Sequence, residues 1–312
     1  MSSSSVNSLI KSAGSALASI AAASATTSRL YLAALRSVFP LLSRFRQEQV
    51  LNSLRSVKWP DSSLRSRPVK LGQKAEFSLQ PHQGEFDFDA ILGGRLVYEP
   101  EMFEFLDQRI DRYDCIIEVG ANIGVYSLYF EKCAKSGVKI YSFEPSRTAY
   151  QRLLHNLKLN EATRVTTFHC AVGEACKLAW FFEPDGHLSN GSLVQDFASI
   201  WSQNVKRNPV LMFGASEFDS LLEGSDRSLI KIDTEGYEAH IIRALQPVLA
   251  RHKPDLIVEV LPTFEQEINQ AIEEVATGYQ TFAITQDGPI RLDSRVQAMQ
   301  GSRDCFLTAH PM

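Results

Sequence analysis

A glycine-punctuated turn after an apolar segment at residues 115–119 is the strongest chemical signal in this sequence. Its pattern is Glu118-x-Gly120-x-Asn122-x-Gly124. Gly120 permits a sharp turn and close approach to a ligand, Asn122 tolerates a left-handed backbone, and Gly124 lets the next helix pack closely. Because Glu118 would repel a pyrophosphate, the turn favours a nucleotide-like ligand that carries an ammonium or sulfonium charge.

A second acid, Glu144, follows the apolar segment 139–143 and lies 24 residues after Gly120. An acid about 20 residues beyond such a turn, at the tip of the neighbouring strand, can accept hydrogen bonds from both ribose hydroxyls. The alternative is that Glu144 caps a helix that begins near Thr148. Together with the glycine turn, Glu144 favours the ribose interpretation.

Four motifs, in this order, resemble those of the FkbM family of S-adenosylmethionine-dependent methyltransferases, over roughly residues 90–265. They are Glu118-Val-Gly-Ala-Asn-Ile-Gly, then Phe143-Glu-Pro with Asn156 and Asn160, then Phe218-Asp-Ser-Leu-Leu, then Ile230-Lys-Ile-Asp-Thr-Glu-Gly-Tyr-Glu238. The resemblance implies a class I methyltransferase fold and S-adenosylmethionine as methyl donor. For many members it also implies O-methylation of a sugar or other natural-product hydroxyl.

Methyl transfer to a hydroxyl requires alignment of that hydroxyl and a base to remove its proton. Asp233, Glu235 and His240 are the candidates for the base, with Glu259 at the tip of the next strand behind them. Alternatively, Asp233 bonds Lys231 or backbone amides, the acids near residue 237 favour a helix dipole, and His240 is structural.

The elements that must position these residues form an alternating series of strands and helices. We expect strands near 115–119, 139–144, 165–171, 229–233, 256–260, 281–284 and 304–308. We expect helices near 100–109, 123–134, 147–159, 237–245 and 263–275, after a hairpin-like lead-in at 75–79 and 85–90. The predicted fold is α/β, a class I, Rossmann-like, seven-stranded, mostly parallel sheet with helices on both faces and an amino-terminal extension.

The segment 183–216 breaks this pattern and is too long for a simple connector. We interpret it as a lid over a small-molecule acceptor, and the alternative is a disordered surface loop. The side chains that suit a carbohydrate are His187, Asn190, Ser192 and Trp201. After the third strand, an adenine contact must come from backbone groups or from Glu174.

Charge separates the chain at about residue 75. Residues 1–75 hold eleven Lys/Arg and two acids, a net charge of +9, so residues 76–312 carry −13 of the total of −4. We therefore expect an extension (1–75) and a methyltransferase domain (76–312). An acidic domain does not suit a nucleic-acid substrate. The five cysteines form no C-x-x-C pair and the seven histidines show no ligand spacing, which favours a reduced, cytoplasmic protein with no metal site.

The first 28 residues are Ser/Ala-rich, which is typical of a flexible tail or a cleaved targeting segment, and we expect them to lie outside the fold. Residues 29–46 interleave apolar residues with arginine. They are compatible with packing, an oligomer contact or a peripheral membrane helix, but not with a transmembrane span. Trp59-Pro-Asp61-Ser-Ser is read as a linker.

Two other functions remain open from the sequence. The first is a nicotinamide-dependent oxidoreductase on a Rossmann sheet, which Asn122 in place of a glycine and the adjacent Glu118 disfavour. The second is a protein that binds S-adenosylmethionine without catalysing methyl transfer.

Overall fold

The computed structural model describes residues 14–96, 98–293, 295–299 and 303–312. The chain forms two compact units. The first takes in the residues up to 71 and residues 76–98, and the second consists of residues 72–75 and 99–312. In the described part of the chain, no helix combines the length and the apolar character that crossing a bilayer requires.

The second unit is built on a twisted sheet with the strand order β13-β12-β14-β11-β10-β4-β5-β6. The strands are β4 (Cys115–Val119), β5 (Lys139–Phe143), β6 (Val165–Phe168), β10 (Ser228–Ile232), β11 (Asp255–Glu259), β12 (Gln280–Thr285), β13 (Gly288–Leu292) and β14 (Asp304–Thr308). The strands from β11 to β6 are parallel, whereas β14, β12 and β13 pair antiparallel. The mostly parallel α/β sheet is confirmed. The expected count of seven strands was wrong, since within the described residues the sheet has eight.

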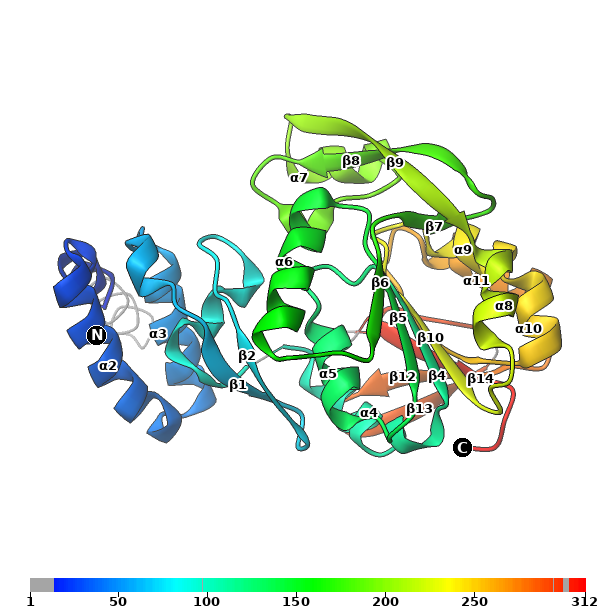
Figure 1. Ribbon diagram of the computed structural model, residues 1–312, viewed down its shortest axis with the longest axis horizontal. Coiled ribbons are helices and arrows are strands. Elements are labelled where there is room, and N and C mark those ends of the chain that lie inside the picture. The colour runs from blue at the N-terminus through cyan, green and yellow to red at the C-terminus, as the bar shows by residue number, and fades with distance from the viewer. Residues whose placement is uncertain (1–13, 97, 294, 300–302) are drawn as a thin grey trace. The chain divides into compact units, whose positions relative to one another are not determined.

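Helices cover both faces of this sheet (Figure 1). On one face, Ile117 and Val119 of β4 share a buried core with Ile241, Ile242 and other residues of the helices α8 to α11. Glu118, which lies between them in β4, points to the opposite face, because side chains alternate along a strand. The helices are α4 (Pro100–Asp107), α5 (Val125–Cys133), α6 (Arg147–Leu159), α8 (Phe218–Leu222), α9 (Glu238–Ala244), α10 (Gln246–His252) and α11 (Glu265–Val275).

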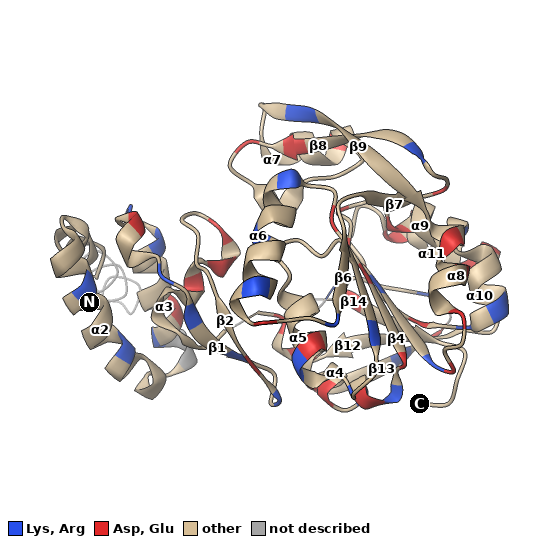
Figure 2. Cartoon of the chain, viewed as in Figure 1, with Lys and Arg blue, Asp and Glu red and all other residues tan. Residues whose placement is uncertain are grey.

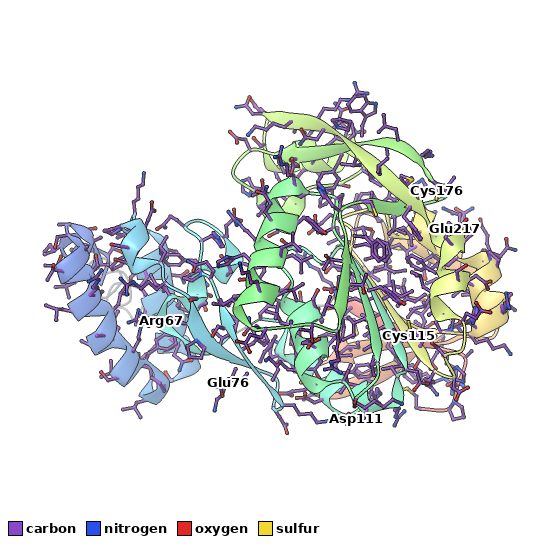
Figure 3. All side chains as sticks on the ribbon, in the orientation of Figure 1. Arg67, Glu76, Asp111, Cys115, Cys176 and Glu217 are labelled. Atoms are coloured by element: carbon purple, nitrogen blue, oxygen red, sulfur yellow. The ribbon has the colours of Figure 1, made fainter. Side chains whose placement is uncertain are left out.

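A second, three-stranded sheet interrupts the series after β6. It has the order β7-β9-β8, formed by β7 (Ala171–Gly173), β8 (Lys177–Pro184) and β9 (Val205–Gly214), with α7 (Gln195–Trp201) between β8 and β9. The strand expected at 165–171 is therefore divided, since β6 ends at Phe168 and Ala171 begins β7. The segment 183–216 is ordered structure, so the disordered-loop alternative was wrong. All five cysteines are free thiols, with Cys115 buried in the main sheet and Cys176 exposed after β7 (Figure 3).

The first unit has its own apolar core. It contains α2 (Ala25–Val38), α3 (Arg44–Arg55), β1 (Arg67–Leu71), all but the first residue of β2 (Ala75–Leu79), β3 (Gly94–Arg95) and short 3-10 helices at Phe39–Leu41, Asp61–Ser63 and Phe86–Leu92. Figure 2 shows Lys and Arg on α2 and α3. Leu32 and Phe39 of α2 and the following turn are buried, whereas Leu30 and Leu41 are exposed. Residues 29–46 thus pack on their own unit with part of their apolar surface.

Three expectations for this unit were wrong. Ala18 and Ala21 are buried in the core with Trp59, so the described part of residues 1–28 belongs to the fold, while residues 1–13 lie outside the described residues. Trp59 is not part of a linker, because its indole nitrogen donates to the carbonyl of Leu54 at 2.9 Å. The expected strand at 85–90 is a 3-10 helix, Phe86–Leu92.

Candidate functional site

The glycine turn at the end of β4 has the left-handed backbone that its residues favour. The φ angles are +87° at Gly120, +48° at Asn122 and +87° at Gly124. A β-carbon at Gly120 would overlap the carbonyl oxygen of Asp233, and one at Gly124 would overlap the side chain of Leu153. The turn thus needs glycine at both positions because neighbouring elements approach it closely.

Glu144 joins this turn to the end of β5. Its carboxylate accepts the backbone N–H of Asn122 at 2.7 Å and that of Ser146 at 2.7 Å. Burial raises the pKa of Glu144 to about 8, although the two N–H bonds act in the opposite direction. The helix that follows is capped by Ser146, whose hydroxyl accepts the N–H of Ala149. Because a carboxylate offers about four lone-pair sites, Glu144 retains acceptors for a ligand beside the turn.

Glu118 lies on the face of β4 that is turned toward α5. Its Oε2 accepts the hydroxyls of Ser127 at 2.5 Å and Ser142 at 2.9 Å. Burial raises its pKa to about 7, while the two hydroxyls and the charge of Lys231 lower it. The structure therefore places the Glu118 carboxylate in a buried network beneath the turn.

Asp233, directly after β10, forms an ion pair with the buried Lys231. The Nζ of Lys231 donates to Oδ2 of Asp233 at 2.7 Å and lies 4.3 Å from the centroid of the Tyr126 ring. Burial lowers the pKa of Lys231, but the charges of Asp233, Glu99 and Asp304 raise it more, so that it exceeds its ordinary value. Lys231 therefore stays charged, and the pairing considered from the sequence is present.

The loop after Asp233 carries two further acids with different environments. Glu238 accepts the N–H groups of Thr234 at 2.8 Å and Gly236 at 3.0 Å, and so closes the loop at the start of α9. Glu235 has a left-handed backbone (φ +57°). Burial and the neighbouring charges of Asp233 and Glu238 raise the pKa of Glu235 to about 8.

His240 lies apart from these acids. Its ring stacks on Tyr237 with a centroid distance of 4.4 Å, and its Nδ1 is 4.0 Å from a carboxylate oxygen of Glu267 on α11. Of the three candidate bases, the structure brings Asp233 and Glu235 together but places His240 on the flank of α9.

Two acids complete the cluster at this edge of the sheet. One carboxylate oxygen each from Asp233, Glu235 and Glu259 lies within 4.8 Å of the others. Asp304 is buried and lies directly opposite Glu259 in the antiparallel register of β14 with β11. Burial, followed by the charge of Glu99, raises the pKa of Asp304 well above its usual range. Nothing in the sequence indicates that Asp304 belongs to this edge, because β14 runs antiparallel and its first residue, not its last, lies there.

The second sheet is attached to both sides of the site. Glu183 at the end of β8 accepts the hydroxyl of Ser146 at 2.5 Å and also bonds the amide of Asn208. The hydroxyl of Ser192 donates to the carbonyl of Glu235 at 2.7 Å. The segment 183–216 therefore connects the region of Glu144 with the loop after β10.

The other residues expected in the lid or against adenine have defined places. The rings of His187 and Trp201 lie 5.7 Å apart, and Trp201 is 42% exposed. Asn190 ends the short 3-10 helix Leu188–Asn190. The carboxylate of Glu174 accepts the hydroxyl of Tyr237 at 2.9 Å. Aromatic and amide groups thus accompany Ser192 on the segment.

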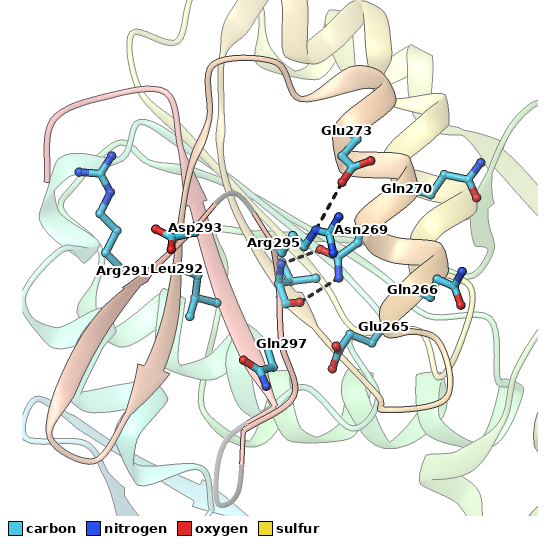
Figure 4. A pocket seen from close by; sticks show the side chains of 11 residues that line it. Glu265, Gln266, Asn269, Gln270, Glu273, Arg291, Leu292, Asp293, Arg295 and Gln297 are labelled. Carbon is cyan, nitrogen blue, oxygen red and sulfur yellow. Dashed lines mark hydrogen bonds and ion pairs between the residues drawn. The ribbon is translucent and has the colours of Figure 1, made fainter.

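A separate polar pocket of about 800 Å³ lies between α11 and residues 291–293 and 295–297 (Figure 4). Asn269 holds this segment by bonding both backbone groups of Val296, at 2.9 and 2.7 Å. Arg295 lies 3.6 Å from Glu273 across the pocket. None of the site residues predicted from the sequence lines this pocket.

Comparisons with known proteins identify the family of this chain. The family model described as Methyltransferase FkbM domain matches residues 118–280, which is 163 of the 312 residues. Methyltransferase sdnD of Sordaria araneosa is 27% identical over 172 residues, which cover 52% of this chain and 59% of that protein. The chain therefore matches about three fifths of that relative's length.

Two methyltransferases are among the solved structures that this chain resembles. Methyltransferase FkbM from Methylobacillus flagellatus KT has a TM-score of 0.39 and 14% identity, over 72% of this chain and 55% of its own. An S-adenosylmethionine-dependent O-methyltransferase from Thermotoga maritima has a TM-score of 0.39 and 16% identity, over 75% and 73% of the two chains.

Proposed function

Since the chain belongs to the FkbM methyltransferase family, we propose that it is an S-adenosylmethionine-dependent methyltransferase acting on a hydroxyl of a sugar-containing or other natural-product small molecule. One observation carries the proposal. Glu144, at the end of β5, is bonded to the glycine turn of β4, and this turn touches the strand end that carries Asp233. The turn that we propose to bind the cofactor and a group of potential bases are thus adjacent.

The residues around the turn fit the proposed cofactor. The side-chain oxygen Oδ1 of Asn122 is covered from solvent and has no hydrogen-bond partner among the described residues, so it can accept a bond from a ligand. Glu144 has free lone pairs for the ribose hydroxyls. Glu118 contributes negative charge beneath the turn, which favours a cationic ligand.

When bound, S-adenosylmethionine would supply a methyl group from its positively charged sulfonium. The task of the protein is then to orient the acceptor hydroxyl and to take up its proton. Glu235 suits this task, because a base with a pKa near the working pH is the most effective and its pKa is about 8. Asp233 contributes a second carboxylate, whose ion pair with Lys231 fixes its position. His240 is left with a packing role.

The acceptor would enter between the carboxylates of Asp233 and Glu235 and the segment 183–216. Ser192 and Glu183 attach this segment to the two sides of the site. That segment offers His187, Asn190 and Trp201, which are groups that bond and stack on carbohydrate. The net charge of −13 on residues 76–312 argues against a nucleic-acid substrate. Membership of the family also disfavours the nicotinamide-dependent alternative.

The proposal is tested by a methyl-transfer assay with a methyl-deuterated donor and a panel of glycosides and hydroxylated polyketides. We expect a labelled methyl ether on at least one acceptor, with stoichiometric S-adenosylhomocysteine, as measured by mass spectrometry. Donor binding without transfer to any acceptor would support the non-catalytic alternative. Label on nitrogen or carbon would contradict O-methylation.

A further inference from the structure

We propose that Asp233, Glu235 and Glu259 bind one divalent cation of the hard type, such as Mg²⁺, Mn²⁺ or Ca²⁺. The three residues come from the end of β10, the following loop and the end of β11. One carboxylate oxygen from each lies within 4.8 Å of the other two. Ligand oxygens on opposite sides of one ion are about 4 Å apart for Mg²⁺ and about 5 Å for Ca²⁺, so a single ion can contact all three.

Asp304 provides an independent observation that a positive charge belongs here. Its residue is 7% exposed, and its carboxylate makes no hydrogen bond or ion pair among the described residues. Asp304 is directly opposite Glu259 in the pairing of β11 with β14, so the two side chains are on the same face of the sheet. A buried, unpaired carboxylate is unfavourable unless a cation compensates it.

Glu259 shows the same deficit at one atom. Its Oε2 is covered from solvent and has no hydrogen-bond partner among the described residues. Its Oε1 lies 3.8 Å from Arg303, which is too far for a hydrogen bond. The unpartnered Oε2 is therefore available to a metal ion.

The charges of the cluster support a divalent ion. Asp233, Glu235, Glu259 and Asp304 are four carboxylates, whereas the only cations paired with them in the described part of the chain are Lys231 and Arg303. If all are ionised, at least two negative charges remain, which one divalent cation would neutralise. Because the donor atoms are all carboxylate oxygens, the site suits a hard cation and not a thiolate- or imidazole-preferring metal.

A role for the cation rests on the proposed function, whereas its binding does not. With the acceptor hydroxyl as a further ligand, the cation would orient this hydroxyl and lower its pKa. A carboxylate that binds the ion through one oxygen keeps its other oxygen for the released proton.

The test is a Mn²⁺ titration of the full chain after dialysis against EDTA, with free Mn²⁺ measured by electron paramagnetic resonance. We expect one site per chain, with Mg²⁺ and Ca²⁺ as competitors. Glu259→Gln should weaken Mn²⁺ binding at least about tenfold. Glu273→Gln is the control, since Glu273 is an exposed acid on α11, outside the cluster. Absence of a Mn²⁺ site in the wild type at millimolar concentration overturns the inference.

Equal Mn²⁺ binding by Glu259→Gln and the control would also overturn the inference, because the ion would then bind elsewhere. If thermal melting shows that Glu259→Gln is unfolded, Glu235→Gln takes its place with the same expected result. S-adenosylmethionine binding is measured by calorimetry on the same EDTA-treated wild type. Cofactor binding without a Mn²⁺ site rejects only the metal site, whereas a Mn²⁺ site without cofactor binding rejects only the proposed function.

Discussion

The carbonyl oxygen of Asp233 occupies the space in which a β-carbon at Gly120 would lie. The two residues follow β4 and β10, which are neighbours in the sheet at the point where the strand order reverses. This close approach places the proposed cofactor turn directly against the strand end that carries the acidic cluster.

Gly120→Ala should therefore destabilise the second unit strongly, since the added methyl group meets backbone that cannot move independently. Thermal melting measures this effect. Gly137→Ala is the matched control, because Gly137 also has a positive φ (+82°) but nothing within 4 Å of its β-carbon position. The difference in melting temperature between the two variants measures the overlap of the added methyl group with Asp233, because both variants carry the cost of a left-handed backbone. Equal melting temperatures would contradict the close approach.

The affinity for S-adenosylmethionine should depend on pH through Glu144. The pKa of Glu144 is raised to about 8 by burial, and only the ionised carboxylate can accept bonds from both ribose hydroxyls. Below pH 8, binding must first release a proton, so affinity should rise from pH 6 to pH 8 and then level off. Calorimetry across this range measures it. The dependence should be smaller in Glu144→Gln, and an unchanged slope in this variant would assign it to another group.

The raised carboxyl pKa values also predict the direction of the stability change. A carboxyl with a higher pKa in the folded than in the unfolded protein holds its proton more tightly when folded. Its contribution to stability is complete below pH of about 4.5 and is lost as the pH rises through the folded value. For Glu118 that value is about 7 and for Glu144 about 8. Urea unfolding of the wild type and Glu118→Gln should therefore converge below pH of about 4.5 and diverge by pH 8, with the variant relatively more stable.

Asp233→Asn should retain cofactor binding but lose about 10²–10⁴-fold in turnover if Asp233 takes the proton. The variant should also be less stable, because Lys231 is buried and would lose its partner, a change that costs about 3–5 kcal/mol for buried pairs. The double variant Lys231→Met/Asp233→Asn removes the unpaired charge and should recover stability without recovering turnover. If turnover returns with stability, Asp233 is structural. If Glu235→Gln alone abolishes turnover while it binds Mn²⁺ as the wild type does, the base is Glu235.

Deletion of residues 1–28 should lower the stability of the first unit and leave cofactor affinity unchanged. Ala18 and Ala21 are buried against Leu32 and Trp59, so their loss exposes apolar surface. The residues proposed to bind the cofactor lie in the second unit, which has its own core. Differential scanning calorimetry should show that the first unit unfolds at a lower temperature or gives no transition. Loss of S-adenosylmethionine binding in the truncated protein would contradict this independence.

The sequence predicted best those strands that are buried on both faces. β4 (Cys115–Val119) and β14 (Asp304–Thr308) have the predicted bounds, since every residue in them is buried and each contains three consecutive apolar residues, 115–117 and 305–307. β13 (Gly288–Leu292) was missed, since its residues are all at least partly exposed and carry no apolar alternation. The linker prediction for Trp59 was wrong because its neighbours Pro60 and Asp61 are turn formers, whereas Trp59 itself is buried in the core of the first unit.

In the candidate site too, contacts between residues close in the sequence could be predicted, whereas contacts between distant residues could not. The turn and Glu144 were predictable, because a strand, a turn and the next strand are close in the sequence. The grouping of Glu259 and Asp304 with Asp233 was not, since it depends on which strands become neighbours and in which direction they run. His240 illustrates the reverse, because its nearness to Glu235 in the sequence did not bring it into the cluster.

Calorimetric titration with S-adenosylmethionine and, separately, with NAD measures which cofactor the folded protein binds. We expect one S-adenosylmethionine site per chain and no NAD binding. Glu144→Ala should weaken the binding by about 1.5–3 kcal/mol, the range for hydrogen bonds to a charged group, while Glu223→Ala at an exposed position should leave it unchanged. Failure of the folded wild type to bind S-adenosylmethionine, or unchanged affinity in Glu144→Ala, would contradict the assignment of this site.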